Sequence, residues 1–140
     1  MIALYDSKYA YHRWRPVTAV QRADNDGNPD TTGDPNWTPL AVTALDPSYA
    51  GAHAEIGQSA AATLPDVFRT DRVDFSLTNP SLPGIVRSFQ SFSQAADEAA
   101  ASRIYAGQHF RYDEDAGQAL GDEIGDFVFD NILGPVPHGR

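Results

Sequence analysis

Cysteine is absent from this chain of 140 residues, and lysine occurs only once, at Lys8. The lack of cysteine excludes disulfides, a thiolate nucleophile and any metal site built on thiolates. Basic residues are also scarce: 10 Lys and Arg stand against 19 Asp and Glu, which gives a formal net charge of −9. Because phosphate backbones and anionic lipid surfaces repel such a chain, we expect no nucleic-acid partner and no membrane partner.

Long apolar runs are missing as well. No stretch approaches the roughly 20 apolar residues that cross a bilayer, and the opening MIALYDSKYAYHRW lacks the basic and then apolar order of a signal peptide. We therefore expect a soluble protein whose cellular compartment is unknown. With 41% hydrophobic residues, residues 1–140 can form a single domain with its own core.

Apolar spacing predicts a mostly helical chain. Residues 2–14 are expected to form a short helix that ends ahead of Pro16, because proline disfavours helical geometry in the residue before it. Further helices are expected at residues 52–64, closed by Pro65, at 84–107, stopped by Gly107, and at 113–133. Residues 22–46, rich in Asp, Asn, Gly and Pro, predict a long ordered loop, and VDFSLT at 73–78 predicts a short extended piece.

The last of these helices is predicted to have an apolar face and an acidic face. The residues expected to point inward are Ala116, Leu120, Ile124, Phe127 and Val128. The acidic residues expected to form a solvated face are Asp113, Glu114, Asp115, Asp122, Glu123 and Asp126.

Two cations and a histidine near the start of a helix could carry chemistry. Lys8 and Arg15 are seven residues apart, which is two helical turns, so we expect both cations to point the same way from one helix. His53 lies at the start of a predicted helix. Free N–H groups near Gly51 and Ala52 would therefore gather beside its ring and attract an oxyanion.

A second group of residues surrounds His109. Arg103 precedes it by six residues, and the two can converge because Gly107 permits the backbone to change course. Asp113 follows His109 by four residues and can accept a hydrogen bond from one ring nitrogen, which leaves the other nitrogen free to attack or to bind. The pattern is that of a nucleophile or ligand with its orienting group.

These patterns resemble the signature of the acid phosphatase and vanadium-dependent haloperoxidase superfamily, also called type 2 phosphatidic acid phosphatases (PAP2). The block K-x6-R-P lies at residues 8–16 and the block S-R-x5-H-x3-D at 102–113. The middle block, P-S-G-H, reads AGAH at 50–53, so that Gly51 takes the place of the serine. The segments WRPVTAV, DGNP and DPNWTPL further resemble the soluble bacterial haloperoxidase-like branch.

The resemblance implies an all-α helical bundle, the C-terminal part of the superfamily core, with a pocket for vanadate or phosphate. His109 would be bonded to vanadium in a peroxidase or phosphorylated in a phosphatase, His53 would be the general acid–base, and Asp113 would orient His109. The groups implied to bind the oxyanion are Lys8, Arg15, Gly51, Ala52 and Arg103.

Three functions remain open. The first is a haloperoxidase that uses vanadate as its cofactor to oxidise a halide with peroxide. The second is a phosphomonoester hydrolase that works through a phosphohistidine at His109 without a cofactor, and the third is a truncated or inactive anion-binding relative. Superfamily members usually carry several helices before the lysine block, whereas seven residues precede Lys8. We therefore expect an open apolar face, covered in a homodimer or by missing N-terminal helices.

Overall fold

The computed structural model describes residues 2–132 of the chain. Its elements, in chain order, are α1 (Ile2–Tyr11), α2 (Pro16–Gln21), a short 3-10 helix η1 (Ala23–Asn25), α3 (Ala52–Phe68), β1 (Phe75–Thr78), β2 (Val86–Phe89), α4 (Phe92–Tyr105) and α5 (Arg111–Asn131). The predicted helical bundle is confirmed, with one small antiparallel sheet in addition. Leu133, the expected end of the last helix, lies outside the described residues.

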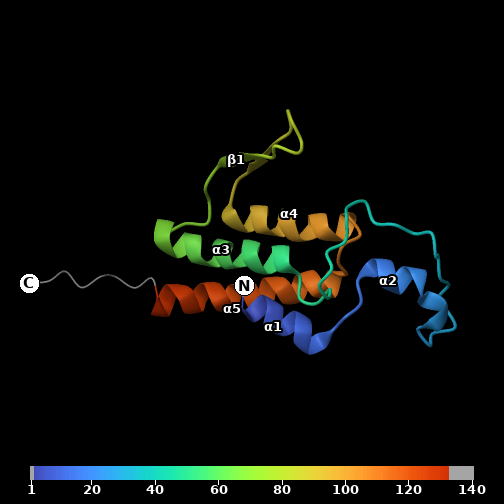
Figure 1. The fold of residues 1–140 in the computed structure, drawn as a ribbon. Coiled ribbons are helices and arrows are strands. Elements are labelled where there is room, and N and C mark those ends of the chain that lie inside the picture. Colours follow the sequence, from blue (N-terminus) through green and yellow to red (C-terminus); the bar gives the residue numbers. More distant parts are fainter. Residues whose placement is uncertain (1, 133–140) are drawn as a thin grey trace, which may run out of the picture.

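Helix α3 is the centre of the bundle. It packs on α5 along one side and on α4 along another, and the three helices run side by side (Figure 1). The β1–β2 hairpin projects beyond α4, while α1 lies next to α5 (Figure 1). Residues of α1 and α5 line one shared hollow. Helix α1 makes fewer contacts with α3, α4 and α5 than these three helices make with one another.

Glycine makes the contact between α3 and α5. Gly117, Gly121 and Gly125 recur every four residues on the buried face of α5. A Cβ on Gly121 would lie 2.5 Å from the carbonyl oxygen of Glu55, and one on Gly125 would lie 2.7 Å from the Cβ of Ala62. The two helices therefore meet backbone to backbone. The apolar face predicted for this helix is only partly inward, since Phe127 is 59% exposed.

The segment before α4 is a hairpin, which corrects the helix predicted from residue 84. Val86 pairs with Thr78 and Phe89 with Phe75 in an antiparallel register, with the two Phe rings 5.3 Å apart. Helix α4 begins after Ser91, whose side chain accepts a hydrogen bond from the Gln94 N–H. The apolar spacing continues from β2 into α4, so periodicity does not reveal where the helix begins. The N-cap residue, Ser91, marks that point.

The two helix ends predicted at proline are also wrong. Pro65 does not close α3, which continues to Phe68 and then ends at Arg69 in the left-handed conformation. A proline within a helix removes one main-chain hydrogen bond. The turn after Pro65 nevertheless packs on α4, where the ring centroids of Phe68 and Phe92 lie 5.9 Å apart. Pro16 ends no helix either: α1 ends at Tyr11 and Pro16 is the first residue of α2.

The predicted loop at 22–46 is ordered by short-range polar contacts. The Asp24 carboxylate accepts a hydrogen bond from the Gly33 N–H at 2.9 Å, and Asp26 accepts from the Asn28 N–H at 2.7 Å. Its second half leaves apolar side chains in solvent, because Leu40, Val42 and Leu45 are each at least 89% exposed.

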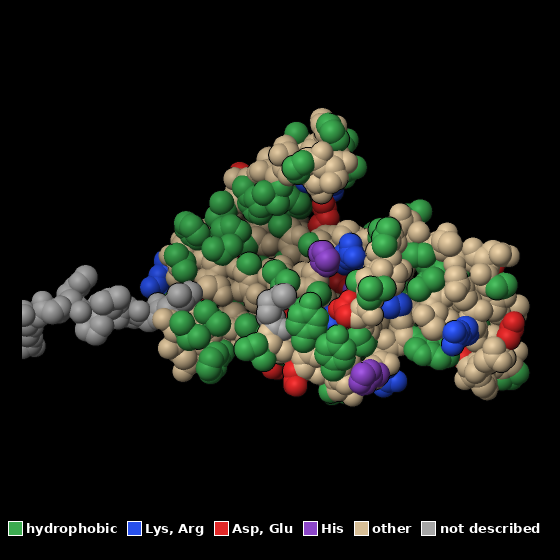
Figure 2. All heavy atoms as spheres, in the orientation of Figure 1, with side chains coloured by type: hydrophobic (Ala, Val, Ile, Leu, Met, Phe, Trp, Pro, Cys, Tyr) green, Lys and Arg blue, Asp and Glu red, His purple; other side chains and the backbone are tan. Residues whose placement is uncertain are grey.

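Apolar side chains are exposed on α1 as well. Ile2 is 91% exposed and Tyr9 is 57% exposed, and hydrophobic atoms gather on the face of the molecule that carries this helix (Figure 2). No helix within the described residues is both long enough and apolar enough to cross a membrane. An apolar face of this kind is typical of a surface that contacts protein.

Candidate functional site

Lys8 is fully buried, and its ammonium group ties the N-terminal helix to residues 46–48. Its Nζ donates hydrogen bonds to the carbonyl oxygens of Pro47 at 2.6 Å and Ser48 at 3.3 Å, and lies 3.2 Å from Oδ2 of Asp46. Three acceptors match the three protons of an ammonium group. Burial is the main cause that lowers the pKa of Lys8, and Arg15 lowers it further, while Asp46 acts in the opposite direction.

Arg15 lies beside Lys8, although not for the reason that the sequence suggested. Because α1 ends at Tyr11, Arg15 precedes α2 in an extended conformation and approaches the site from a separate segment. Its Nε and Nη2 donate to the carbonyl oxygen and to Oδ1 of Asp46, both at 3.0 Å. The prediction that Lys8 and Arg15 lie on one continuous helix is wrong. The two cations are nevertheless close together, because the chain turns after α1 and both contact the Asp46 carboxylate.

The imidazole of His109 is buried between a cation and a hydroxyl group. Arg15 Nη1 donates to its Nε2 at 2.8 Å, and because a guanidinium group only donates, Nε2 carries a lone pair. The ring proton therefore lies on Nδ1, which is 3.3 Å from Ser48 Oγ and 3.5 Å from Asp113 Oδ2. Burial lowers the pKa of His109 and outweighs the opposing effect of Asp113. The ring is thus a neutral base with Nε2 directed at the cations.

Asp113 is the orienting carboxylate, and Ser48 works with it. The Asp113 carboxylate is fully buried, accepts the Ser48 hydroxyl at 2.6 Å and accepts the Phe110 N–H at 2.9 Å. Burial alone would raise the pKa of Asp113, but the hydrogen bonds from His109, Ser48 and Phe110 lower it below its ordinary value. An ionised Asp113 therefore fixes the His109 tautomer from the far side of the ring.

Glu114 is the unexpected member of the site. It is 1% exposed, neither of its carboxyl oxygens has a hydrogen-bond partner, and Oε1 lies 3.6 Å from His109 Nδ1. Burial raises its pKa to about 7, despite the opposing effect of Arg103. The predicted solvated acidic face is confirmed for four residues, Asp115, Asp122, Glu123 and Asp126, which are exposed. For Asp113 and Glu114 the prediction is wrong, because the first turn of α5 lies in the core.

The carboxyl group of Glu114 fills the space beside Gly51. A Cβ built on Gly51 would lie 2.5 Å from Glu114 Oε1 and 2.7 Å from its Cδ. The Gly51 N–H donates to the Asp113 carbonyl oxygen at 2.8 Å, so this predicted oxyanion donor is already occupied. Ala52 is the first residue of α3, where backbone N–H groups have no partner within the helix.

His53 and Arg103 form the open side of the site. His53 lies in the first turn of α3, and its side chain is exposed. Partial desolvation is the main cause that lowers the pKa of His53, and the cations of the site lower it further, with Arg103 the strongest among them. Arg103 Nη2 is 3.5 Å from Gln108 Oε1, and its buried Nε has no partner. Arg103 is therefore a cation with unused hydrogen-bonding capacity.

The structure gathers the predicted residues around His109 and adds others that the sequence analysis missed. Gly107, with a φ of 71°, supplies the predicted change of course between Arg103 and His109. No hydrogen bond among residues 2–132 joins His53 to the other groups, so its place rests on electrostatic proximity. The residues missed are Asp46, Ser48, Gln108 and Glu114. Ser48 lies next to the block at 50–53, and Gln108 and Glu114 lie within or beside the block at 102–113, so only Asp46 is remote from both in sequence.

Gly51→Ser is expected to destabilise the protein. The backbone at Gly51 (φ −71°, ψ 111°) suits any residue, so the cost is steric and comes from the Glu114 carboxyl group, at about 1–3 kcal/mol for an overpacked site. In the Glu114→Ala background the same change should cost at least ~1 kcal/mol less, because the obstructing atoms are gone. Urea denaturation of the four proteins measures this coupling.

Gly57→Ser is the matched control, since a Cβ there meets its nearest neighbour at an ordinary 3.6 Å. Its cost should not depend on Glu114. Equal costs of Gly51→Ser in both backgrounds would show that Glu114 does not fill this space.

Glu114→Gln is expected to remove part of the pH dependence of stability. The folded pKa of about 7 lies above the ordinary 4.5, so between these pH values the folded state keeps a proton that the unfolded state loses. The free energy of unfolding should therefore fall as pH rises from about 4.5 to 7, by up to about 3 kcal/mol. The Gln variant should lack this fall and be more stable than wild type at pH 8.

The measurement is urea denaturation at pH 5 and at pH 8, with Glu123→Gln on the exposed side of α5 as the control. The difference between wild type and Glu114→Gln should grow with pH, while that for Glu123→Gln should stay constant. A difference that is the same at both pH values would contradict the raised pKa.

Comparison with known proteins gives a family and a set of solved structures. The family described as the VCPO second helical-bundle domain matches residues 1–136. A bacterial vanadium-dependent iodoperoxidase is 34% identical, with a TM-score of 0.78 over 92% of this chain and 29% of its own. The apo and holo forms of a bacterial vanadium-dependent chloroperoxidase, at 21% and 20% identity, give TM-scores of 0.76 and 0.75.

Each chloroperoxidase form likewise covers 92% of this chain, which corresponds to 33% of the apo chain and 32% of the holo chain. The chain thus spans about a third of the length of these solved relatives. No curated protein matches it significantly. The similarity to the chloroperoxidases establishes the fold, and the family match extends over nearly the whole sequence. The chain therefore belongs to the vanadium haloperoxidase family, as its VCPO second helical-bundle domain.

Proposed function

We propose that this chain carries the oxyanion site of a vanadium-dependent haloperoxidase and takes part in the oxidation of a halide by peroxide. The observation that carries the proposal is the state of His109: a neutral, buried ring whose Nε2 lone pair points at a guanidinium group. An anion that binds through its central atom at Nε2 would replace the hydrogen bond from Arg15, whose guanidinium group could then contact the oxygens of the anion.

The residues of the site fit a tetrahedral oxyanion. Vanadate is held by cations and one imidazole, so the donor set of Lys8, Arg15, Arg103 and His109 has the required chemistry. The buried Nε of Arg103, which has no partner, is an additional donor for such an anion. When bound, vanadate supplies the Lewis acid that activates hydrogen peroxide towards a halide.

The protein's own groups then have separate tasks. Asp113 and Ser48 hold the His109 proton on Nδ1, so that Nε2 stays unprotonated. His53, with its lowered pKa, is neutral at pH 7 and can accept a proton from an incoming acid such as peroxide and return it later. Arg15 and Arg103 bring positive charge to the anion.

The test is His109→Asn in the purified protein, with His12→Asn as the matched control. His12 is exposed and has a positive φ of 48°, a conformation that asparagine tolerates. We expect wild type to oxidise iodide with peroxide and vanadate, and His109→Asn to lose at least 100-fold in kcat/KM and to bind vanadate more weakly. His12→Asn should stay within twofold of wild type. Iodide is chosen because the 34% identical relative is an iodoperoxidase.

The alternatives give different results in the same samples. Hydrolysis of an aryl phosphate, inhibited by vanadate and absent in His109→Asn, would instead support a phosphatase with a phosphohistidine. Binding of vanadate without turnover would indicate an inactive anion-binding relative. No calorimetric signal with vanadate or with phosphate would refute the oxyanion site.

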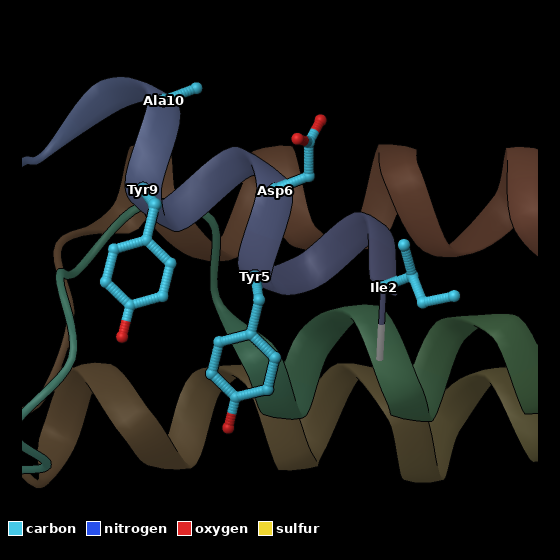
Figure 3. Close-up of a pocket in the computed structure, with 5 residues that line it drawn as sticks. All are labelled: Ile2, Tyr5, Asp6, Tyr9 and Ala10. Carbon is cyan, nitrogen blue, oxygen red and sulfur yellow. The ribbon is translucent and has the colours of Figure 1, made fainter.

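We also propose that the exposed face of α1 is covered by a second copy of the chain. Tyr5 and Tyr9 project from the same side of α1 beside a hollow that Ile2 also lines (Figure 3). Their rings are stacked, with centroids 6.3 Å apart. Two tyrosines and an isoleucine in one exposed row support an interface between protein chains.

Tyr9→Lys is expected to weaken self-association, because lysine keeps the helix propensity but places a charge in the interface. Sedimentation velocity over a range of concentrations measures this, with Tyr105→Lys, an exposed tyrosine at the end of α4, as the control. A wild-type protein that stays monomeric at every concentration would contradict the proposed homodimer.

A further inference from the structure

Asp46 occupies the same cations that the proposed oxyanion needs. One carboxylate oxygen, Oδ2, lies 3.2 Å from Lys8 Nζ, and the other, Oδ1, lies 3.0 Å from Arg15 Nη2. A carboxylate that places one oxygen on each of two cations uses the contacts that two oxygens of a phosphate or vanadate would use. The side chain thus provides the negative charge that this pair of cations would otherwise lack.

The other acceptors of Lys8 and Arg15 cannot leave. Lys8 also donates to the carbonyl oxygens of Pro47 and Ser48, and Arg15 also donates to the carbonyl oxygens of Asp46 and Gln108. Apart from Nε2 of the buried His109 ring, which Arg15 Nη1 also contacts, these acceptors are main-chain groups that can move only if the backbone moves. The Asp46 carboxylate is on a short side chain that is 22% exposed and can rotate towards water. It is the acceptor that an incoming anion can replace at least cost.

Charge makes simultaneous binding unfavourable. Burial would raise the pKa of Asp46, but Lys8 and Arg15 outweigh it and lower the pKa below its ordinary value, so the carboxylate is ionised at neutral pH. An oxyanion at the same two cations would lie within a few ångströms of this charge, where like charges repel strongly in a partly buried site. One of the two anions must therefore move away.

We propose that Asp46 is an internal competitor for the oxyanion site and sets its affinity. In the anion-free protein its carboxylate is bound to Lys8 and Arg15, and an oxyanion binds by displacing it towards solvent, while His109 and Arg103 supply the contacts that Asp46 does not make. This inference rests on the proposed oxyanion site. It predicts that the natural residue at position 46 weakens binding of the anion.

Asp46→Asn tests the proposal, because the amide keeps an oxygen acceptor for one cation but removes the negative charge. Calorimetric titration with orthovanadate and with inorganic phosphate should show at least tenfold tighter binding by Asp46→Asn than by wild type. Asp126→Asn, which removes the same charge from an exposed position on α5, should stay within twofold. Circular dichroism and thermal unfolding establish that both variants are folded.

A second measurement uses the wild-type protein, so that it does not depend on the folding of a variant. The carboxyl ¹³C resonance of Asp46 should shift when phosphate saturates the site, and its pKa should rise towards the ordinary value as Lys8 and Arg15 are lost as partners. A resonance that saturating phosphate leaves unchanged would overturn the proposal.

The outcomes separate this inference from the proposed function. If wild type binds vanadate and Asp46→Asn binds it equally or more weakly, Asp46 supports the site and does not compete for it. If neither protein binds vanadate or phosphate, the oxyanion site is refuted, and the proposed competition by Asp46 is refuted as well. If Asp46→Asn and Asp126→Asn both bind the anion more tightly than wild type, the change in net charge explains the gain in affinity, and the proposal is overturned.

Discussion

The burial of Lys8 is the constraint on which the site depends. An ammonium group with no exposure to water must be surrounded by acceptors, because an unpaired buried charge is among the most destabilising features that a protein can have. The acceptors come from residues 46–48, so satisfying Lys8 fixes that segment against α1. Ser48 is then in position to contact His109 and Asp113, and Asp46 to contact Arg15.

The polar groups of this region also show how an acidic protein can maintain a basic site. Cations and carboxylates lie close together in the interior: Lys8 and Arg15 contact Asp46, and the neutral ring of His109 lies between Arg15 and Asp113. Each carboxylate lowers the cost of burying a cation, but it also lowers the net positive charge that an anion would meet. In the proposed oxyanion site, stability without the anion and affinity for the anion are therefore opposed.

The sequence predicted the components of the site better than their arrangement. Spacing alone identified His109 with Asp113, and the course change at Gly107 was anticipated from its lack of a side chain. The continuous helix through Lys8 and Arg15 was wrong because periodicity cannot detect a helix end that lacks a marker residue. Asp46 and Glu114 were missed because their roles depend on which segments meet in three dimensions. Glu114 lies in an acidic run that resembles any solvated helix face, and only its burial beside Gly51 and His109 distinguishes it.

The glycine contact between α3 and α5 has a consequence for the precision of the site. His53 is on α3, while Asp113 and Glu114 are on α5. Because these two helices touch through main-chain atoms at Gly117 and Gly121, the spacing between the two halves of the site does not vary with side-chain rotamers. Main-chain contacts therefore set the distance between the start of α3 and the first turn of α5, even though the bundle is small and one of its surfaces is open.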